Sequence, residues 1–203
     1  MTLVYLLRHG ETVWNAEGNK YCGLTDIELS DTGLKQTEAA REILSVVSFD
    51  KVYASPLQRA VKTAEVISGN VKNIVTDERL SEINFGGWEG LTRSEIEHTD
   101  KLRWDEWLVD PDTVHAGESG EKGFDVVKRG LHFFEDLKKH HEDHVILVVA
   151  HNTFNRLLAT EWLGLPRSSY RSIKMHNAGI SILEINEKTE VIQWNSMMHL
   201  SQL

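Results

Sequence analysis

Two histidines in this chain each stand at the end of a short run of apolar residues. His9 lies in the segment LVYLLRHG at residues 3–10, and His151 follows HVILVVA at residues 144–150. Continuous apolar runs of this length are typical of strands that are buried on both faces. Arg8 and His9 at the mouth of such a strand, beside a glycine that permits close backbone approach, indicate an anion-binding site.

The elements expected along the rest of the chain place both histidines at one edge of a sheet. The patterns predict further strands at residues 51–54, 73–76, 180–185 and 191–194, and helices from 31 to about 48, from a Ser55-Pro56 N-cap to about 68, after 120, and from 153 to 163. This alternation predicts an α/β fold with three layers, α/β/α, a mainly parallel central sheet and an antiparallel edge. In such folds ligands bind beyond the carboxyl ends of the strands.

One segment does not fit the alternation. Residues 92–119 are expected to form a helical, lid-like excursion from a single domain that spans residues 1–203. The excursion holds Trp104 and Trp107, which can either line a substrate pocket or anchor the lid in the core. The helix that follows it should bury one face, formed by Phe124, Val127, Leu131 and Phe134.

Composition and charge narrow the class of protein and of partner. Of the 203 residues, 40% are hydrophobic and 26% charged, as in an ordinary globular protein. No apolar run reaches the roughly 18 residues of a membrane span, no signal-like segment follows Met1, and the single cysteine, Cys22, cannot form an intramolecular disulfide. We therefore expect a cytoplasmic protein. A formal net charge of −9 argues against nucleic-acid or membrane partners, and a homodimer stays open.

Five short segments carry a more specific signal. They are RHGETVWN at residues 8–15, GLTD at 23–26 with Leu29-Ser30 and Gly33, SPLQRA at 55–60, Glu82 with GGWEG at 86–90, and Ala150-His151. In this order they resemble the signature of the histidine phosphatase superfamily, the phosphoglycerate mutase-like proteins. The resemblance spans nearly the whole chain and implies a phosphatase-type member.

The chemistry of a phosphate monoester explains these residue types. Near neutral pH the ester carries close to two negative charges, so the attacking group must be neutral and surrounded by positive charge. The imidazole of His9, with an ordinary pKa of about 6.5, can attack phosphorus and form a phosphohistidine that water later hydrolyses. Arg8 and Arg59 supply planar donor forks, and His151 can donate to an equatorial oxygen. Because these groups supply the positive charge, no metal or other cofactor is expected.

Other residues complete the expected site. By resemblance, Glu82 gives a proton to the departing oxygen and then takes one from water, although it could merely cap a backbone amide. Asn15 is expected to bind phosphate, or else to organise the loop that presents Glu11. The backbone amides of Cys22 and Gly23 are expected as further donors.

The chain also departs from the family pattern. Asn152 follows His151 where family members often have glycine, which adds a side chain to the substrate-binding pocket and puts the substrate in doubt. Cys22 stands where many members have glutamine, and with no basic partner in sequence it is not expected to be a reactive thiol. Features of α-ribazole phosphatases and of phosphoserine-type phosphatases are both present, so the choice between these substrates stays open.

Two other activities are alternatives to hydrolysis of a small phosphorylated metabolite. A phosphoglycerate mutase shares the first half-reaction but passes the phosphoryl group to a substrate hydroxyl. Family mutases typically have a longer chain with extra lid segments, so this short chain favours hydrolysis. A silent phosphate-binding module would lack a nucleophile or an acid, and the intact His9, Glu82 and His151 argue against it. The HHEDH segment at residues 140–144 invites a metal site, but a solvated connection is the ordinary expectation.

Overall fold

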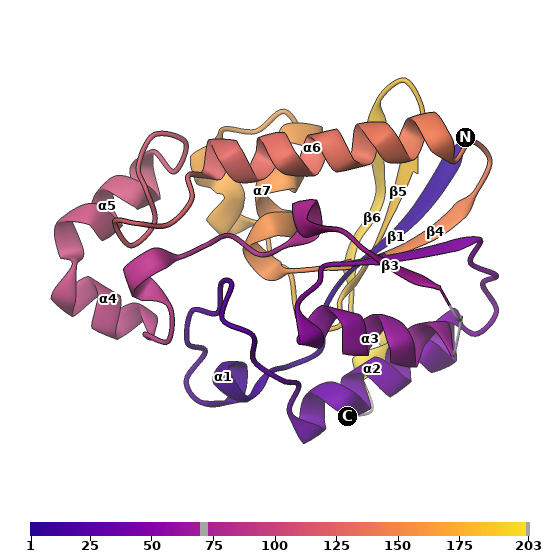
Figure 1. The fold of residues 1–203 in the computed structure, drawn as a ribbon, viewed down its shortest axis with the longest axis horizontal. Helices are drawn as coiled ribbons and strands as arrows, with labels where there is room; N and C mark the ends of the chain where they lie inside the picture. The colour runs from indigo at the N-terminus through magenta and orange to yellow at the C-terminus, as the bar shows by residue number, and fades with distance from the viewer. Residues whose placement is uncertain (70–72, 202–203) are drawn as a thin grey trace.

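The two apolar runs that precede the histidines lie side by side at the centre of one sheet (Figure 1). The computed structural model describes residues 1–69 and 73–201. In this part of the chain the strands are β1 (Thr2–Arg8), β2 (Lys51–Ala54), β3 (Ile74–Thr76), β4 (Val145–Ala150), β5 (Ile180–Ile185) and β6 (Thr189–Ser196). Their spatial order is β3-β2-β4-β1-β5-β6. The first four in this order are parallel to one another, β5 is antiparallel to β1, and β6 is antiparallel to β5, which confirms the expected sheet.

The strands of the sheet centre are apolar throughout because both faces are covered. Val4 and Leu6 of β1 belong to one hydrophobic cluster, whereas Leu7 belongs to a second cluster on the other face. β4 alternates in the same way, with Val148 in the first cluster and Val149 in the second. Since successive side chains of a strand point to opposite faces, these runs need apolar residues at every position.

Two pairs of helices cover the two faces (Figure 1). α2 (Asp31–Leu44) and α3 (Gln58–Ser68) contribute their buried residues to one cluster, and α6 (Gly123–His140) and α7 (Asn152–Trp162) contribute theirs to the other. The three-layer α/β/α prediction is therefore confirmed. None of the helices in the described ranges is long and apolar enough to cross a membrane.

Some predicted boundaries were wrong. α2 ends at Leu44 instead of near residue 48, and α3 begins at Gln58 with Leu57 as its N-cap, so Ser55-Pro56 is not the cap. The first turn of α3 is capped from a distance instead, because Asp26 Oδ1 accepts the Gln58 N–H at 2.8 Å.

The expected apolar face of the long helix was also partly wrong. Phe124 is 55% exposed, whereas the buried stripe of α6 is centred on Gly130. At 3.6 residues per turn the two positions lie about 120° apart around the helix axis, so Phe124 points away from the sheet.

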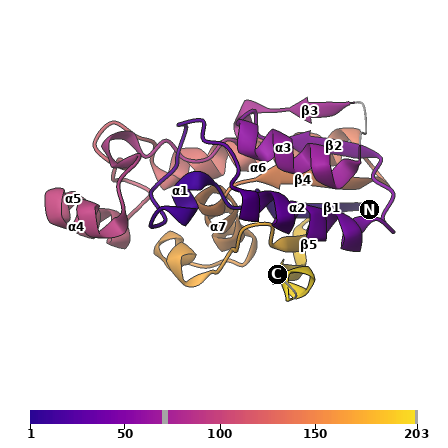
Figure 2. The ribbon, with the colours of Figure 1, turned by 90° about the horizontal axis from the view of Figure 1, so that it is seen from below.

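The excursion is helical, as expected, and lies at one end of the molecule (Figure 2). It contains α4 (Arg93–Thr99) and α5 (Lys101–Val109). Trp104 and Trp107 are 1% and 0% exposed and pack in the same core cluster as Trp88, so they anchor the excursion. The remaining short elements are α1 (Val13–Ala16) and the 3-10 helices Glu78–Leu80, Gly86–Trp88, Arg167–Ser172 and Met198–Leu200.

The loop after β1 packs closely on the N-terminus of α2. A Cβ on Gly33 would overlap the backbone carbonyl of Glu11. Ser30 strengthens the same contact, because its hydroxyl caps α2 through the Gly33 N–H at 3.0 Å and donates to Glu11 Oε1 at 2.8 Å. Close approach of backbones thus holds the segment that follows His9.

We expect Gly33→Ala to destabilise the protein although alanine is the better helix former. Overpacking of this kind costs about 1–3 kcal/mol, which lowers the Tm of a chain of this length by roughly 2–12 °C. Thermal unfolding checks this, with Glu38→Ala, at an exposed position of the same helix, as the control. A Gly33→Ala protein as stable as Glu38→Ala would show that the contact is not tight.

Candidate active site

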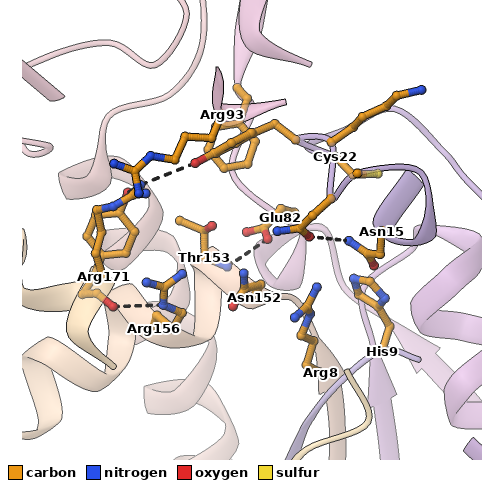
Figure 3. Close-up of a pocket in the computed structure, with 16 residues that line it drawn as sticks. Arg8, His9, Asn15, Cys22, Glu82, Arg93, Asn152, Thr153, Arg156 and Arg171 are labelled. Atoms are coloured by element: carbon orange, nitrogen blue, oxygen red, sulfur yellow. Dashed lines mark hydrogen bonds between the residues drawn. The ribbon is translucent and has the colours of Figure 1, made fainter. Parts of the chain in front are cut away.

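The sheet register brings the two histidines together. Arg8 pairs with Ala150 across the parallel strands, so the next residues, His9 and His151, leave the sheet at the same edge. Their ring centroids are 5.1 Å apart, and the side chains are 4% and 0% exposed. The predicted meeting of the two strand ends is thus present, with Arg8 beside His9 (Figure 3).

The hydrogen bonds of His9 determine which ring nitrogen can react. Its Nδ1 lies 2.6 Å from the Gly10 carbonyl oxygen, which can only accept, so Nδ1 carries the proton. In the neutral ring, Nε2 then keeps its lone pair. Burial, followed by the positive charges of Arg59 and Arg8, holds the pKa of His9 well below its ordinary value. His9 is therefore a neutral imidazole with a free nucleophilic nitrogen.

His151 has the opposite tautomer. Its Nδ1 accepts a hydrogen bond from Arg59 Nε at 3.3 Å, so the proton of the neutral ring is on Nε2. Burial, with the charge of Arg59 next in size, holds the pKa of His151 well below its ordinary value. The Nε2 atom is buried and has no partner within residues 1–69 and 73–201. A buried donor without a partner costs free energy, and an oxygen of a bound anion would satisfy it.

The two predicted arginines differ in how many of their hydrogen-bond donors are already used. Arg59 is fully buried, and apart from His151 it donates to the carbonyl oxygens of Thr25 (2.9 Å), Gly23 (2.6 Å) and Cys22 (3.5 Å). It fixes the 22–25 loop and His151, and its direct contact with phosphate stays a prediction.

Arg8 retains free donors. Its Nη1 binds the Met175 carbonyl oxygen at 2.9 Å, but its Nε is buried without a partner in the described chain. Burial lowers the pKa of Arg8 to about 10, which leaves the guanidinium charged at neutral pH. Arg8 is thus the cation with unused hydrogen-bonding capacity next to His9.

Glu82 caps a helix and also lines the pocket. Its carboxylate accepts the backbone N–H groups of Thr153 (2.9 Å) and Phe154 (2.8 Å), in the first turn of α7, and that of Ile83 (3.0 Å). The interpretation that Glu82 caps backbone amides is therefore confirmed. Burial raises the pKa of Glu82, an effect that the backbone donors oppose. A carboxyl group that holds its proton to higher pH can act as an acid, and its catalytic role stays a prediction.

Several of these groups border one cavity of about 300 Å³. Among the predicted residues, its lining includes Arg8, His9, Asn15, Cys22, Glu82 and Asn152. Gly23, Arg59 and His151 are not lining residues, although Arg59 contacts both of the others.

The side chain of Asn15 forms hydrogen bonds within the protein. Asn15 Oδ1 accepts from the Thr12 N–H at 3.1 Å and from Asn177 Nδ2 at 3.2 Å, so it organises the loop after His9. Its contact with phosphate stays a prediction.

Burial raises the pKa of the Cys22 thiol to about 11. A neutral thiol is a poor nucleophile, which agrees with the expectation that Cys22 is not reactive.

Arg129, on α6, was missed by the sequence analysis. It donates to the carbonyl oxygens of Arg79 (2.8 Å), Ser81 (2.7 Å) and Glu82 (3.1 Å), and it forms an ion pair with Glu121 at 3.0 Å. It thus clamps the loop that carries Glu82. No sequence pattern could reveal this, because its partners are mainly backbone carbonyls.

The sequence analysis also missed several lining residues, among them Tyr21, Arg156, Tyr170 and Arg171. A weak signal existed for one of them, because Arg156 follows Asn152 by four residues on α7 and so shares its face. Arg171 lies in a short 3-10 helix, where no periodicity identifies it.

Known proteins resemble this chain over nearly its whole length. The family model of the histidine phosphatase superfamily (branch 1) matches residues 4–196. Phosphoserine phosphatase 1 of Hydrogenobacter thermophilus is 31% identical over 204 residues, which cover 100% of this chain and 96% of that protein.

Solved structures share the fold. YhfR of Bacillus stearothermophilus has a TM-score of 0.91 and 29% identity, covering 99% of this chain and 100% of that one. A mutant phosphoserine phosphatase of Entamoeba histolytica in complex with phosphoserine has a TM-score of 0.89 and 31% identity, covering 98% and 100%. The phosphatases among these relatives support phosphate hydrolysis as the activity of this chain.

We expect Arg129→Lys to lower kcat more than it raises KM. Lysine keeps the charge but cannot bind several carbonyl oxygens at once, so the Glu82 loop shifts, and a shift of about 1 Å at a catalytic group can cost up to about a hundredfold in rate. Steady-state kinetics check this, with Lys128→Gln on the exposed face of the same helix as the control. Unchanged kcat in a folded Arg129→Lys protein would show that the clamp does not position Glu82.

Proposed function

The chain belongs to the histidine phosphatase superfamily, branch 1, and on that premise we propose that it hydrolyses a small phosphate monoester through a phosphohistidine on His9. The observation that carries the proposal is the pair of complementary tautomers. His9 offers the lone pair of Nε2 while His151 offers the N–H of its Nε2, and the rings are 5.1 Å apart. One neutral nucleophile beside one neutral donor suits a dianionic phosphoryl group.

In the first step, His9 Nε2 attacks phosphorus and the bond from phosphorus to the ester oxygen breaks. Arg8 and His151 donate to the nonbridging oxygens, where charge is spread in the transition state. The departing alkoxide takes a proton from Glu82, whose raised pKa favours the acid form.

In the second step, water attacks the phosphohistidine. Glu82, now a carboxylate, takes a proton from this water as the bond between phosphorus and His9 Nε2 breaks. Inorganic phosphate leaves, and both His9 and Glu82 return to their starting protonation states. The positive charge comes from side chains, so the proposed reaction uses no metal ion.

Transfer to water distinguishes this reaction from that of a mutase. The relatives named as phosphatases support hydrolysis, and the phosphoserine phosphatases among them put phosphoserine on the panel of candidate substrates. α-Ribazole phosphate and phosphoglycerate belong on the same panel, since the sequence left all three open.

We expect His9→Ala to lower phosphate release from such a panel by at least about a thousandfold, because the nucleophile is lost. Chelator should leave the wild-type rate unchanged. Brief incubation with p-nitrophenyl phosphate, an alkaline quench and mass spectrometry should find a phosphoryl group on His9. Hydrolysis that survives His9→Ala, or that stops with chelator, would contradict the mechanism. Phosphoryl transfer to an added glycerate in place of phosphate release would identify a mutase.

The effect of Glu82→Gln should depend on the leaving group. An alkoxide needs a proton to leave, so kcat/KM for an alkyl phosphate should fall by about 10²–10⁴-fold, whereas p-nitrophenolate leaves without one and its kcat/KM should fall far less. In the wild type, kcat/KM for the alkyl phosphate should decline as the pH rises through the raised pKa of Glu82. This decline should be absent in the variant.

The ratio of the two substrates does not depend on the fraction of folded protein. It therefore remains informative if Glu82→Gln weakens the N-terminus of α7, which Glu82 caps. An equal loss for both substrates, with the alkaline decline retained, would exclude Glu82 as the acid.

A further inference from the structure

The pocket has a second cationic wall away from His9. Arg156, from α7, and Arg171, from the 3-10 helix Arg167–Ser172, both line it together with Tyr21 and Tyr170. Figure 3 shows these arginines on one side of the pocket and Arg8 and His9 on the other, with Asn152 between them. The two ends of the cavity therefore carry separate sets of guanidinium groups.

Neither arginine of the second wall has an acidic partner. Across residues 1–69 and 73–201, the salt bridges include neither Arg156 nor Arg171, whereas the pocket-lining Arg93 pairs with Glu97 at 2.7 Å and Lys20 with Glu17 at 2.9 Å. The chain has 31 acidic residues and 22 basic ones, so partners are not scarce. Partly buried charges are normally paired, and leaving two adjacent ones unpaired costs stability.

Their donors are largely unused. Arg156 donates through Nε to the Tyr170 carbonyl oxygen at 2.9 Å, and its Nη1 and Nη2 have no hydrogen bond to the described residues. Arg171 Nη1 makes only long contacts, 3.5 Å to Tyr21 Oη and 3.4 Å to Tyr170 Oη. A guanidinium with both terminal nitrogens free matches the two oxygens of a carboxylate or of a phosphate.

Aromatic side chains hold both groups in place. The guanidinium carbon of Arg171 lies 4.7 Å from the ring centre of the buried Trp104, and that of Arg156 lies 5.0 Å from the ring centre of Tyr170. Trp107 Nε1 donates to Tyr170 Oη at 2.9 Å and so fixes the ring. These contacts position both guanidinium groups in the absence of a ligand, which reduces the entropy cost of binding.

The charge of Arg156 acts on both of the neighbouring arginines of the pocket. Burial lowers the pKa of Arg156, and the positive charge of Arg171 adds to this effect. The charge of Arg156 in turn helps to lower the pKa of Arg8, after burial itself, so the two ends of the cavity are within electrostatic reach. A single phosphoryl group at His9 would leave the distant wall unneutralised.

We propose that Arg156 and Arg171 form a second oxyanion-binding site, so that the preferred substrate is a small phosphate monoester that carries a carboxylate or a second phosphate. The proposal rests on the hydrolytic function proposed above. A cavity of about 300 Å³ holds a compact molecule of this kind, with its phosphoryl group at His9 and its second oxyanion at the opposite wall.

Three compounds with one carbon skeleton test the proposal. They are 3-phosphoglycerate, glycerol 3-phosphate and glycerol 1,3-bisphosphate, which carry a carboxylate, a neutral hydroxymethyl group and a phosphate at the far end. We expect the wild type to have a kcat/KM about ten- to hundredfold higher for at least one of the charged compounds than for glycerol 3-phosphate. The better of the two identifies the oxyanion. A ratio near one for both would overturn the proposal without any variant.

Variants then locate the site. Arg156→Gln and Arg171→Gln should each reduce the ratio of charged to neutral substrate by about tenfold or more, whereas Arg156→Lys should retain part of it. Arg41→Gln removes one charge from an exposed position outside the pocket and should leave both the ratio and the activity unchanged. A ratio that persists in both glutamine variants would place the second oxyanion elsewhere.

p-Nitrophenyl phosphate separates this proposal from the hydrolytic one, because it has no second anion. If the wild type fails to hydrolyse it through His9, the proposed function itself is wrong. If hydrolysis proceeds through His9 while the three glycerol-based compounds are treated alike, only the second oxyanion site is wrong.

Discussion

The site depends on keeping two buried imidazoles neutral and in opposite tautomers. A ring buried among guanidinium groups resists protonation, since both desolvation and like charge oppose it. One hydrogen bond per ring then decides where the remaining proton lies: the Gly10 carbonyl oxygen holds it on Nδ1 of His9, and Arg59 Nε excludes it from Nδ1 of His151. Arg59 and Arg8 thus help to keep both rings neutral, and Arg59 also sets the tautomer of His151.

The positions of the two rings depend on the register of the sheet and on the N-terminus of α7. The register that sets Arg8 opposite Ala150 fixes the spacing of the two rings, and the N-terminus of α7 binds Glu82 through its backbone N–H groups. His151 is the N-cap residue of α7, but its side chain does not cap the helix. Because Glu82 takes over that task, His151 is free to face Arg59 and His9. Capping of α7 and placement of the Glu82 carboxyl group are therefore one interaction.

Much of this could be predicted from the sequence because the informative residues are local. Continuous apolar runs predicted β1 and β4, and the histidines that end them predicted the edge where the site lies. What could not be predicted depends on contacts between distant segments. Asp26 caps α3 at Gln58. Arg129 donates to carbonyl oxygens of a loop about fifty residues earlier in the chain. Arg59 donates to carbonyl oxygens of the 22–25 loop. Backbone partners leave no residue pattern, so propensity and spacing alone cannot find them.

The two ends of the pocket are also built differently. The end at His9 is made of residues that directly follow strands, and the register of the sheet leaves them little freedom. The opposite end is made of Arg156 on a helix and Arg171 in a 3-10 segment. The tryptophans of the excursion help to position both: Trp104 packs against Arg171, and Trp107 binds the tyrosine that packs against Arg156. Changes in the excursion or in the 3-10 segment can therefore alter the far wall without moving the histidines. In the proposed reaction, the sheet edge supplies the chemistry, and the helices that cover it discriminate among phosphate esters.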